Sequence, residues 1–285
     1  MPLTNIRMNL FKINFIKLIF FLGQNTIFGR GLCRKFLISI LNNFILNSKD
    51  KKNLNPRFDL LINAVPFNFY SDNRTGKKIY FGRNECKEID FIKSKLDCDF
   101  VFIDIGANMG LYTNSIAYKF GQFPDAKIIC IEPDPISHKR LKQNLNLLLK
   151  KNPNIFKQVK LEKCAVGNKN SDLKLYLGHD HAVTSFSNSH KKQRYLTIHQ
   201  KKLLGIIKKY KLSKITMLKI DIEGYEDRAL TTYFKNAKKS LFPKYIVIEH
   251  SNKKMWKENV LSYLLKIGYS KIWNNNNNAI LSLNK

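Results

Sequence analysis

The chain has 285 residues, enough to bury a substantial core, and a formal net charge of +29. Its length allows one large domain or, as we favour, a domain with a small appendage. Charged residues interrupt every apolar stretch before it reaches 18 residues, so no membrane-spanning helix is predicted. The charge would attract polyanions, but the lysines are spread along the chain, as A/T-rich codon usage would produce, and arginines and aromatic residues form no cluster. We therefore expect no specific nucleic-acid binding.

The cysteines are odd in number and irregularly spaced, without a C-x-x-C pair: Cys33, Cys86, Cys98, Cys130 and Cys164. Neither a disulfide framework nor a zinc site follows from this spacing, and we assign no metal site. A reducing cytoplasm is therefore the predicted compartment.

The first 55 residues combine apolar residues with scattered lysine and arginine, and Lys12 and Lys17 interrupt the apolar run of residues 9–22. This pattern predicts one or two basic amphipathic helices. Two interpretations stay open: peripheral contact with an anionic membrane through residues 1–50, or a helical appendage packed on the following domain. No small-residue cleavage site follows the run, so a cleaved signal peptide is not expected. Residues 51–56 are predicted to be a linker, and we divide the chain into a segment 1–55 and a domain 56–285.

Strands and helices alternate through most of the domain. After a predicted hairpin of segments 67–70 and 78–81 and a short helix over 89–96, apolar runs predict strands over 101–105, 128–131, 159–166, 216–222 and 244–249. Helices are predicted over 108–120, 134–151, 225–237 and 255–267. Residues 269–273 and 279–283, joined by five asparagines, predict a final antiparallel hairpin.

This order predicts an α/β fold with a mostly parallel seven-stranded sheet, helices on both faces and a C-terminal antiparallel hairpin. Such sheets bind ligands at the carboxyl ends of their strands. The excursion of residues 167–213, between the third and fourth strands of the alternation, is long for a connection, and we expect it to select the substrate.

A glycine-containing turn, Asp104-Ile-Gly106-Ala-Asn108-Met-Gly110, directly follows the strand predicted over 101–105. Glycines at a strand-to-helix turn let a ligand approach the backbone, and the helix amino end offers unpaired N–H groups. A dinucleotide-binding turn would have glycine where Asn108 stands. The acid before the turn suits a cationic ligand better than a phosphate, which disfavours the alternative of a nicotinamide-dependent oxidoreductase.

Carboxylates follow two further strands. Glu132 ends the next strand, where a carboxylate can accept hydrogen bonds from both ribose hydroxyls, so with the glycine turn it predicts a nucleoside site. The alternative is a structural turn beside a solvated acid. Asp221 and Glu223 leave the fourth strand of the alternation, where the reacting centre of such a sheet lies, and we predict a functional role for both. Glu226 is predicted to cap the following helix.

Three segments together resemble the FkbM family of S-adenosylmethionine-dependent methyltransferases: FIDIGANMGLYT at 102–113, IEPDP at 131–135 and LKIDIEGYE at 218–226. The segment IVIEH at 246–250 resembles the family's fifth strand. The resemblance covers roughly residues 65–250, and its motifs are specific in combination. It implies a Rossmann-like methyltransferase fold and methyl transfer to a hydroxyl oxygen of a small molecule, often a sugar or a lipid-linked glycan.

By this resemblance, the methionine end of S-adenosylmethionine is contacted by Asp104, Gly106, Asn108 and Gly110. Its ribose is contacted by Glu132 and its adenine by Ala165. A hydroxyl nucleophile needs positioning and removal of its proton. Our catalytic candidates are Asp221, Glu223 and His250, with His181 as a further possible base. Where the family commonly has a T-L-D-like element, this chain has Leu196-Thr-Ile-His199, which leaves the position without an aspartate for substrate or metal. A non-enzymatic basic module that binds anionic membrane or nucleic acid is the remaining alternative.

Overall fold

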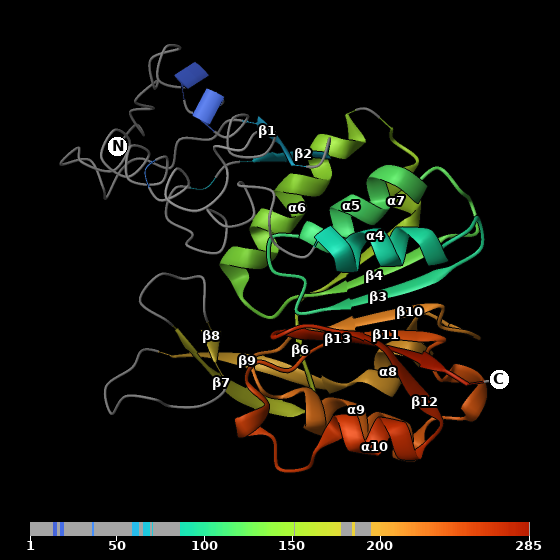
Figure 1. Ribbon diagram of the computed structural model, residues 1–285. Helices are drawn as coiled ribbons and strands as arrows, with labels where there is room; N and C mark the ends of the chain where they lie inside the picture. The colour runs from blue at the N-terminus through green and yellow to red at the C-terminus, as the bar shows by residue number, and fades with distance from the viewer. Residues whose placement is uncertain are drawn as a thin grey trace. The chain divides into compact units, whose positions relative to one another are not determined.

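The computed structural model describes residues 14–15, 18–19, 36, 59–62, 65–68, 70, 86–150, 152–177, 184–185 and 195–284 (Figure 1). The chain divides into two compact units, residues 1–86 with 180–182 and residues 87–179 with 183–285. No described helix is long and apolar enough to cross a membrane. The predicted linker 51–56 lies outside the described residues, as does most of the amphipathic segment 9–22.

The described part of the first unit contains an antiparallel hairpin of β1 (Asp59–Ile62) and β2 (Val65–Asn68), in which Ile62 pairs with Val65. The side chains of Val65 and Phe67 are buried. The sequence predicted a strand at 67–70 but missed β1, whose run of four residues is too short to show a period. Residues 78–81, the predicted partner strand, lie outside the described residues.

The second unit is built on a seven-stranded sheet with the order β12-β13-β11-β10-β3-β4-β5. Its strands are β3 (Val101–Ile105), β4 (Lys127–Ile131), β5 (Val159–Glu162), β10 (Met217–Ile220), β11 (Tyr245–Glu249), β12 (Tyr269–Asn274) and β13 (Asn278–Leu283). β3, β4, β5, β10 and β11 are parallel, and β13 runs antiparallel to both β11 and β12. The predicted fold class is therefore confirmed: a mostly parallel, doubly wound sheet of the Rossmann-like kind with a C-terminal antiparallel hairpin.

Helices cover both faces of this sheet. Figure 1 shows one face covered by α4 (Cys86–Lys95), α5 (Leu111–Phe120), α6 (Pro135–Leu149) and α7 (Ile155–Gln158), and the other by α8 (Leu203–Lys209), α9 (Glu226–Asn236) and α10 (Val260–Lys266). Two caps follow from local sequence, since Asp134 Oδ2 accepts a hydrogen bond from Ser137 N at 2.7 Å and Asn259 Oδ1 one from Ser262 N at 3.1 Å. α10 begins five residues later than predicted, after a 3-10 turn over Lys253–Met255.

The long excursion forms a second sheet, and this corrects one predicted strand. Its order is β6-β9-β7-β8, made of β6 (Ala165–Gly167), β7 (Ser171–Leu177), β8 (Thr184–Ser185) and β9 (Tyr195–Lys202). The single strand predicted over 159–166 is wrong, because β5 pairs with β4 in the main sheet whereas β6 pairs with β9 in the second one. An apolar run shows that a segment is extended but not which strand it pairs with.

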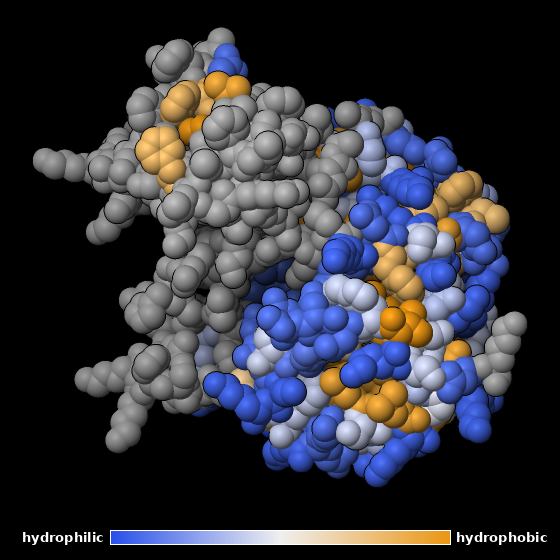
Figure 2. Space-filling model, in the orientation of Figure 1, coloured by the Kyte–Doolittle hydropathy of each residue, from blue (hydrophilic) through white to orange (hydrophobic). Residues whose placement is uncertain are grey.

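The surface of the second unit is mostly hydrophilic on the face drawn in Figure 2, with apolar residues in small separate patches. Exposed large apolar residues of this unit include Tyr118, Ile136, Leu265 and Ile272, which come from separate elements. Apolar residues scattered in this way are normal for a globular surface and mark no interface by themselves.

Candidate functional site

The carboxyl ends of four neighbouring strands bring the predicted site segments to one edge of the main sheet. Ile220 of β10 pairs with Ile105 of β3 and with Ile248 of β11, while Ile105 also pairs with Ile131 of β4. The residues that follow these positions therefore stand side by side. The chain order reverses between β3 and β10, which is the switch point where ligands of open α/β sheets bind.

Backbone geometry explains both glycines of the turn. Gly106 has φ 76°, and a Cβ there would lie 1.8 Å from the carbonyl oxygen of Asp221. Gly110 has φ 94°, and a Cβ there would lie 2.4 Å from Leu141 Cδ1 of α6. Asn108 also has positive φ, so α5 begins at Leu111, three residues later than predicted. The turn therefore packs tightly against the loop after β10 and against α6.

Asp104 is fully buried beneath this turn and holds the start of α5. Its Oδ2 accepts hydrogen bonds from Thr113 N at 3.2 Å and Thr113 Oγ1 at 2.7 Å. Its Oδ1 lies 3.6 Å from Lys219 Nζ, which donates to Gly106 O at 3.1 Å and lies 3.8 Å from Asp221 Oδ2. Lys219 thus joins the turn to the loop after β10. The sequence gives no sign of this role, because one lysine among fifty lysine and arginine residues carries no signal of its own.

Glu132 faces the glycine turn across the sheet edge. Its Oε2 accepts a hydrogen bond from Asn108 N at 2.7 Å, and its Oε1 one from Asp134 N at 2.9 Å. The side chain is 6% exposed, and burial raises the pKa of Glu132 to about 7 although both hydrogen bonds lower it. Asn108 Oδ1 is buried without a hydrogen-bond partner among the described residues. The structure therefore brings together the two segments that predicted a nucleoside site.

Four carboxylates gather beside this turn, three from the loop and helix after β10 and one from the end of β11: Asp221, Glu223, Glu226 and Glu249. Burial, followed by repulsion from neighbouring acids, raises the pKa of Glu223 to about 7 and that of Glu249 to about 8. Glu223 Oε2 accepts a hydrogen bond from Asn252 Nδ2 at 2.8 Å. Glu249 is not among the residues predicted from the sequence, although it ends a predicted strand as Glu132 does.

Glu226 is the first residue of α9, and its carboxylate binds the loop before the helix instead of making the predicted cap. Its Oε1 accepts hydrogen bonds from Ile222 N at 2.8 Å and Gly224 N at 3.3 Å, and its Oε2 one from Trp256 Nε1 at 2.8 Å. The side chain is completely buried. Glu226 thereby orders the loop that carries Asp221 and Glu223.

The remaining predicted residues lie in other surroundings. His250 is buried, and its Nε2 lies 3.0 Å from Asn274 Oδ1 of the C-terminal hairpin. Ala165 packs with Leu175 and Ile198 inside the second sheet, so only its backbone can contribute polar contacts. His181 lies outside the described residues.

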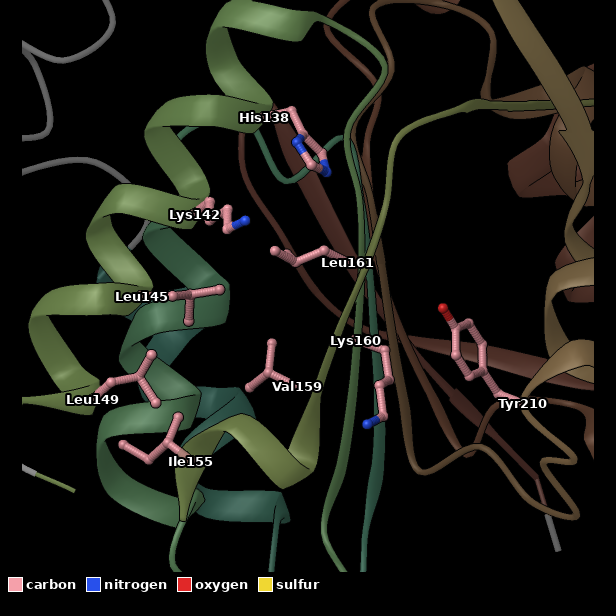
Figure 3. Close-up of a pocket in the computed structure, with 9 residues that line it drawn as sticks. All are labelled: His138, Lys142, Leu145, Leu149, Ile155, Val159, Lys160, Leu161 and Tyr210. Carbon is pink, nitrogen blue, oxygen red and sulfur yellow. The ribbon is translucent and has the colours of Figure 1, made fainter. Parts of the chain in front are cut away.

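A cavity of about 410 Å³ lies between α6 and β5 and shares no lining residue with the glycine turn or the four carboxylates (Figure 3). Leucine, isoleucine and valine side chains line it beside His138, Lys142, Lys160 and Tyr210. Burial and the charges of Lys163 and Lys142 lower the pKa of His138. Since its lining holds no carboxylate, this cavity is not the acidic site at the strand ends.

The domain combines a doubly wound sheet with a glycine turn, an acid at the end of the neighbouring strand and further carboxylates at the switch point. This is the place where α/β domains of this class bind their ligands. Residues 104–271, more than half of the chain, match the family described as the methyltransferase FkbM domain. The chain belongs to this family, which confirms the resemblance seen in the three sequence segments. A comparison with curated proteins finds no match.

Solved structures similar to the chain include methyltransferases, all at low identity. The FkbM methyltransferase of Methylobacillus flagellatus KT is 15% identical with a TM-score of 0.43, and the match covers 74% of this chain and 54% of that one. An rRNA methylase from Streptococcus thermophilus is 12% identical with a TM-score of 0.42, covering 71% and 98%. TrmK of M. capricolum, in complex with S-adenosyl-homocysteine, is 11% identical with a TM-score of 0.39, covering 70% and 68%. The chain thus spans about half the length of the FkbM methyltransferase it matches.

Proposed function

We propose that the protein transfers a methyl group from S-adenosylmethionine to a hydroxyl oxygen of a small molecule, a sugar or a lipid-linked glycan. The observation that carries this proposal is the contact between the glycine turn and Glu132, whose Oε2 lies 2.7 Å from Asn108 N. Membership of the methyltransferase FkbM domain family supports the reaction class.

The residues at the strand ends fit this cofactor. Each oxygen of Glu132 accepts one backbone N–H and keeps a second lone pair for a ribose hydroxyl. Asn108 Oδ1, which is buried and has no partner among the described residues, is an acceptor for the cofactor's amino group. Four nearby carboxylates suit a cationic ligand and would repel the pyrophosphate of a dinucleotide.

S-adenosylmethionine, when bound, supplies a methyl group activated by a sulfonium. The acceptor oxygen forms the new bond to the methyl carbon while the carbon–sulfur bond breaks, so the chain must orient the hydroxyl and take up its proton. We assign the proton to Asp221, whose side chain is 29% exposed at the end of β10 and can be reached by an acceptor. Glu223, held by Asn252, orients the hydroxyl. His250 supports the site through its contact with Asn274.

Cofactor binding and acceptor class are tested separately. Glu132→Ala should weaken the binding of S-adenosylhomocysteine, measured by calorimetry, at least about tenfold, or ~1.4 kcal/mol. The matched variant Glu258→Ala, which removes an exposed carboxylate, should bind like the native protein. Unchanged affinity in Glu132→Ala would refute the site assignment.

For the acceptor, the protein is incubated with methyl-labelled cofactor and a lysate fractionated into polysaccharide, lipid and small-molecule pools. Label found only in protein or nucleic acid would overturn the acceptor class.

We also propose that the protein acts in the cytoplasm, at the surface of a membrane. The free thiols of Cys98, Cys130 and Cys164 suit a reducing cytoplasm. In our division of the chain, the basic segment 1–55 contacts an anionic membrane peripherally and the domain 56–285 carries the reaction. Cell fractionation tests this, since peripheral protein should leave the membrane pellet in high salt. Protein that stays in the pellet through a salt wash would contradict it.

A further inference from the structure

Three carboxylates from different elements converge at the switch point of the sheet. Asp221 follows β10, Glu226 is the first residue of α9, and Glu249 ends β11. One oxygen from each lies within 4.8 Å of the oxygens of the other two. Such an arrangement concentrates negative charge in a largely buried place, which is costly unless a cation or protons balance it.

The ion pair between this group and Lys219 is long and shared with Asp104. Lys219 Nζ lies 3.8 Å from Asp221 Oδ2 and slightly closer, at 3.6 Å, to Asp104 Oδ1. Arg228, although close in sequence, directs its guanidinium to Asp227 Oδ1 and to Gly224 O. One lysine shared between Asp104 and Asp221 cannot balance the charge of Asp104 together with that of all three carboxylates of the group.

A second, independent observation comes from Glu249. The residue is only 7% exposed, and its Oε1 accepts a hydrogen bond from Ser251 N at 3.0 Å. Its Oε2 is buried and has no hydrogen-bond partner within the part of the chain that the structure describes. A buried carboxylate oxygen without a donor is costly, and a cation held together with Asp221 and Glu226 would supply the missing partner.

We propose that Asp221, Glu226 and Glu249 bind a hard divalent cation such as Mg²⁺, Mn²⁺ or Ca²⁺. All three ligands are oxygens, which is the ligand type these ions prefer. Opposite ligands lie about 4.2 Å apart around Mg²⁺ and about 5 Å apart around Ca²⁺, so a spacing within 4.8 Å suits this class of ion. Glu226 keeps its hydrogen bonds, because its Oε2 accepts only one, from Trp256, and has a second lone pair for the ion. Water completes the coordination at the exposed side of Asp221.

Cation binding itself does not depend on the proposed function, but its use does. If an acceptor hydroxyl binds at Asp221, the ion would orient its oxygen and favour loss of its proton. S-adenosylhomocysteine binding in metal-free buffer tests the cofactor site without the ion, so failure of one proposal is distinguishable from failure of the other.

Terbium luminescence gives a direct test, because Trp256 Nε1 lies 2.8 Å from Glu226 Oε2 and can transfer excitation to a bound Tb³⁺. Excitation of tryptophan should produce saturable terbium emission that Mn²⁺, Mg²⁺ or Ca²⁺ displaces. Trp256→Phe should lose most of this emission and still bind Mn²⁺, measured by electron paramagnetic resonance.

Glu249→Gln should weaken both Tb³⁺ and Mn²⁺ binding at least about tenfold, or ~1.4 kcal/mol. Asp221→Asn, at a more exposed position, should do the same and guards against a folding defect of the first variant, which thermal melting would reveal. Glu258→Gln, whose side chain is 57% exposed, should bind like the native protein. Native affinity in both Glu249→Gln and Asp221→Asn, or no saturable binding of either ion, would overturn the proposal.

Discussion

The affinity of the protein for S-adenosylhomocysteine should depend on pH through one buried carboxylate. Burial raises the pKa of Glu132 to about 7, against an ordinary value of 4.5. Ribose hydroxyls donate hydrogen bonds to the ionised form of Glu132, so they favour loss of its proton. Near neutral pH the ligand must therefore bind a protein in which part of the Glu132 side chains are protonated.

The size of the effect follows from the pKa. If only the ionised form binds, the apparent Kd is the intrinsic Kd multiplied by one plus the ratio of protonated to ionised Glu132. With a pKa of about 7, this factor is close to 1 at pH 8, about 2 at pH 7 and about 11 at pH 6. Affinity should thus fall roughly tenfold between pH 8 and pH 6, which corresponds to about 1.4 kcal/mol.

Isothermal titration calorimetry with S-adenosylhomocysteine at pH 6, 7 and 8 checks this prediction. Glu132→Gln, which cannot ionise, should bind more weakly at pH 8 and with nearly the same affinity at all three values. Glu258→Gln, an exposed position, should keep the native pH dependence. Equal affinity of the native protein at pH 6 and pH 8, or an unchanged pH dependence in Glu132→Gln, would refute the reasoning.

Three further predictions concern stability. Because folding raises the pKa of Glu132, its contribution to the free energy of unfolding is complete below pH 4.5 and is lost as the pH rises through 7. Urea denaturation of the ligand-free protein should therefore find a loss of about 3 kcal/mol from this residue, absent in Glu132→Gln. Gly110→Ala should lower the free energy of unfolding by about 1–3 kcal/mol, since the new Cβ would lie 2.4 Å from Leu141 Cδ1 and the residue has positive φ. Gly106→Ala should lower it further, because its Cβ would meet the backbone of Asp221. Gly205→Ala should raise the free energy of unfolding by up to about 1 kcal/mol, because Gly205 lies in α8 and a Cβ there would have no atom within 4 Å. Similar losses of stability in all three glycine variants would contradict the steric argument.

Local sequence predicted the central strands well. The apolar run of residues 101–105 matches β3, and Asp134 with Pro135 marks the start of α6. Boundaries moved where backbone conformation depends on neighbours, as at α5, whose start is delayed by the positive φ of Asn108 and Gly110. Within the candidate site, the sequence predicted the glycine turn, Glu132 and the acids after β10, because each follows a strand that its own apolar run predicts.

The order of elements, the glycine turn and the carboxylates at strand ends were determined by the sequence alone, because they depend on residues close together along the chain. Tertiary structure decided which strands are neighbours. It divided the predicted strand 159–166 between two sheets and inserted β13 between β11 and β12. It also placed Glu249 beside Asp221, 28 residues away in sequence, and Lys219 between Asp104 and Asp221. Such proximities follow from long-range strand pairing, and the pattern within a single strand carries no information about its partner.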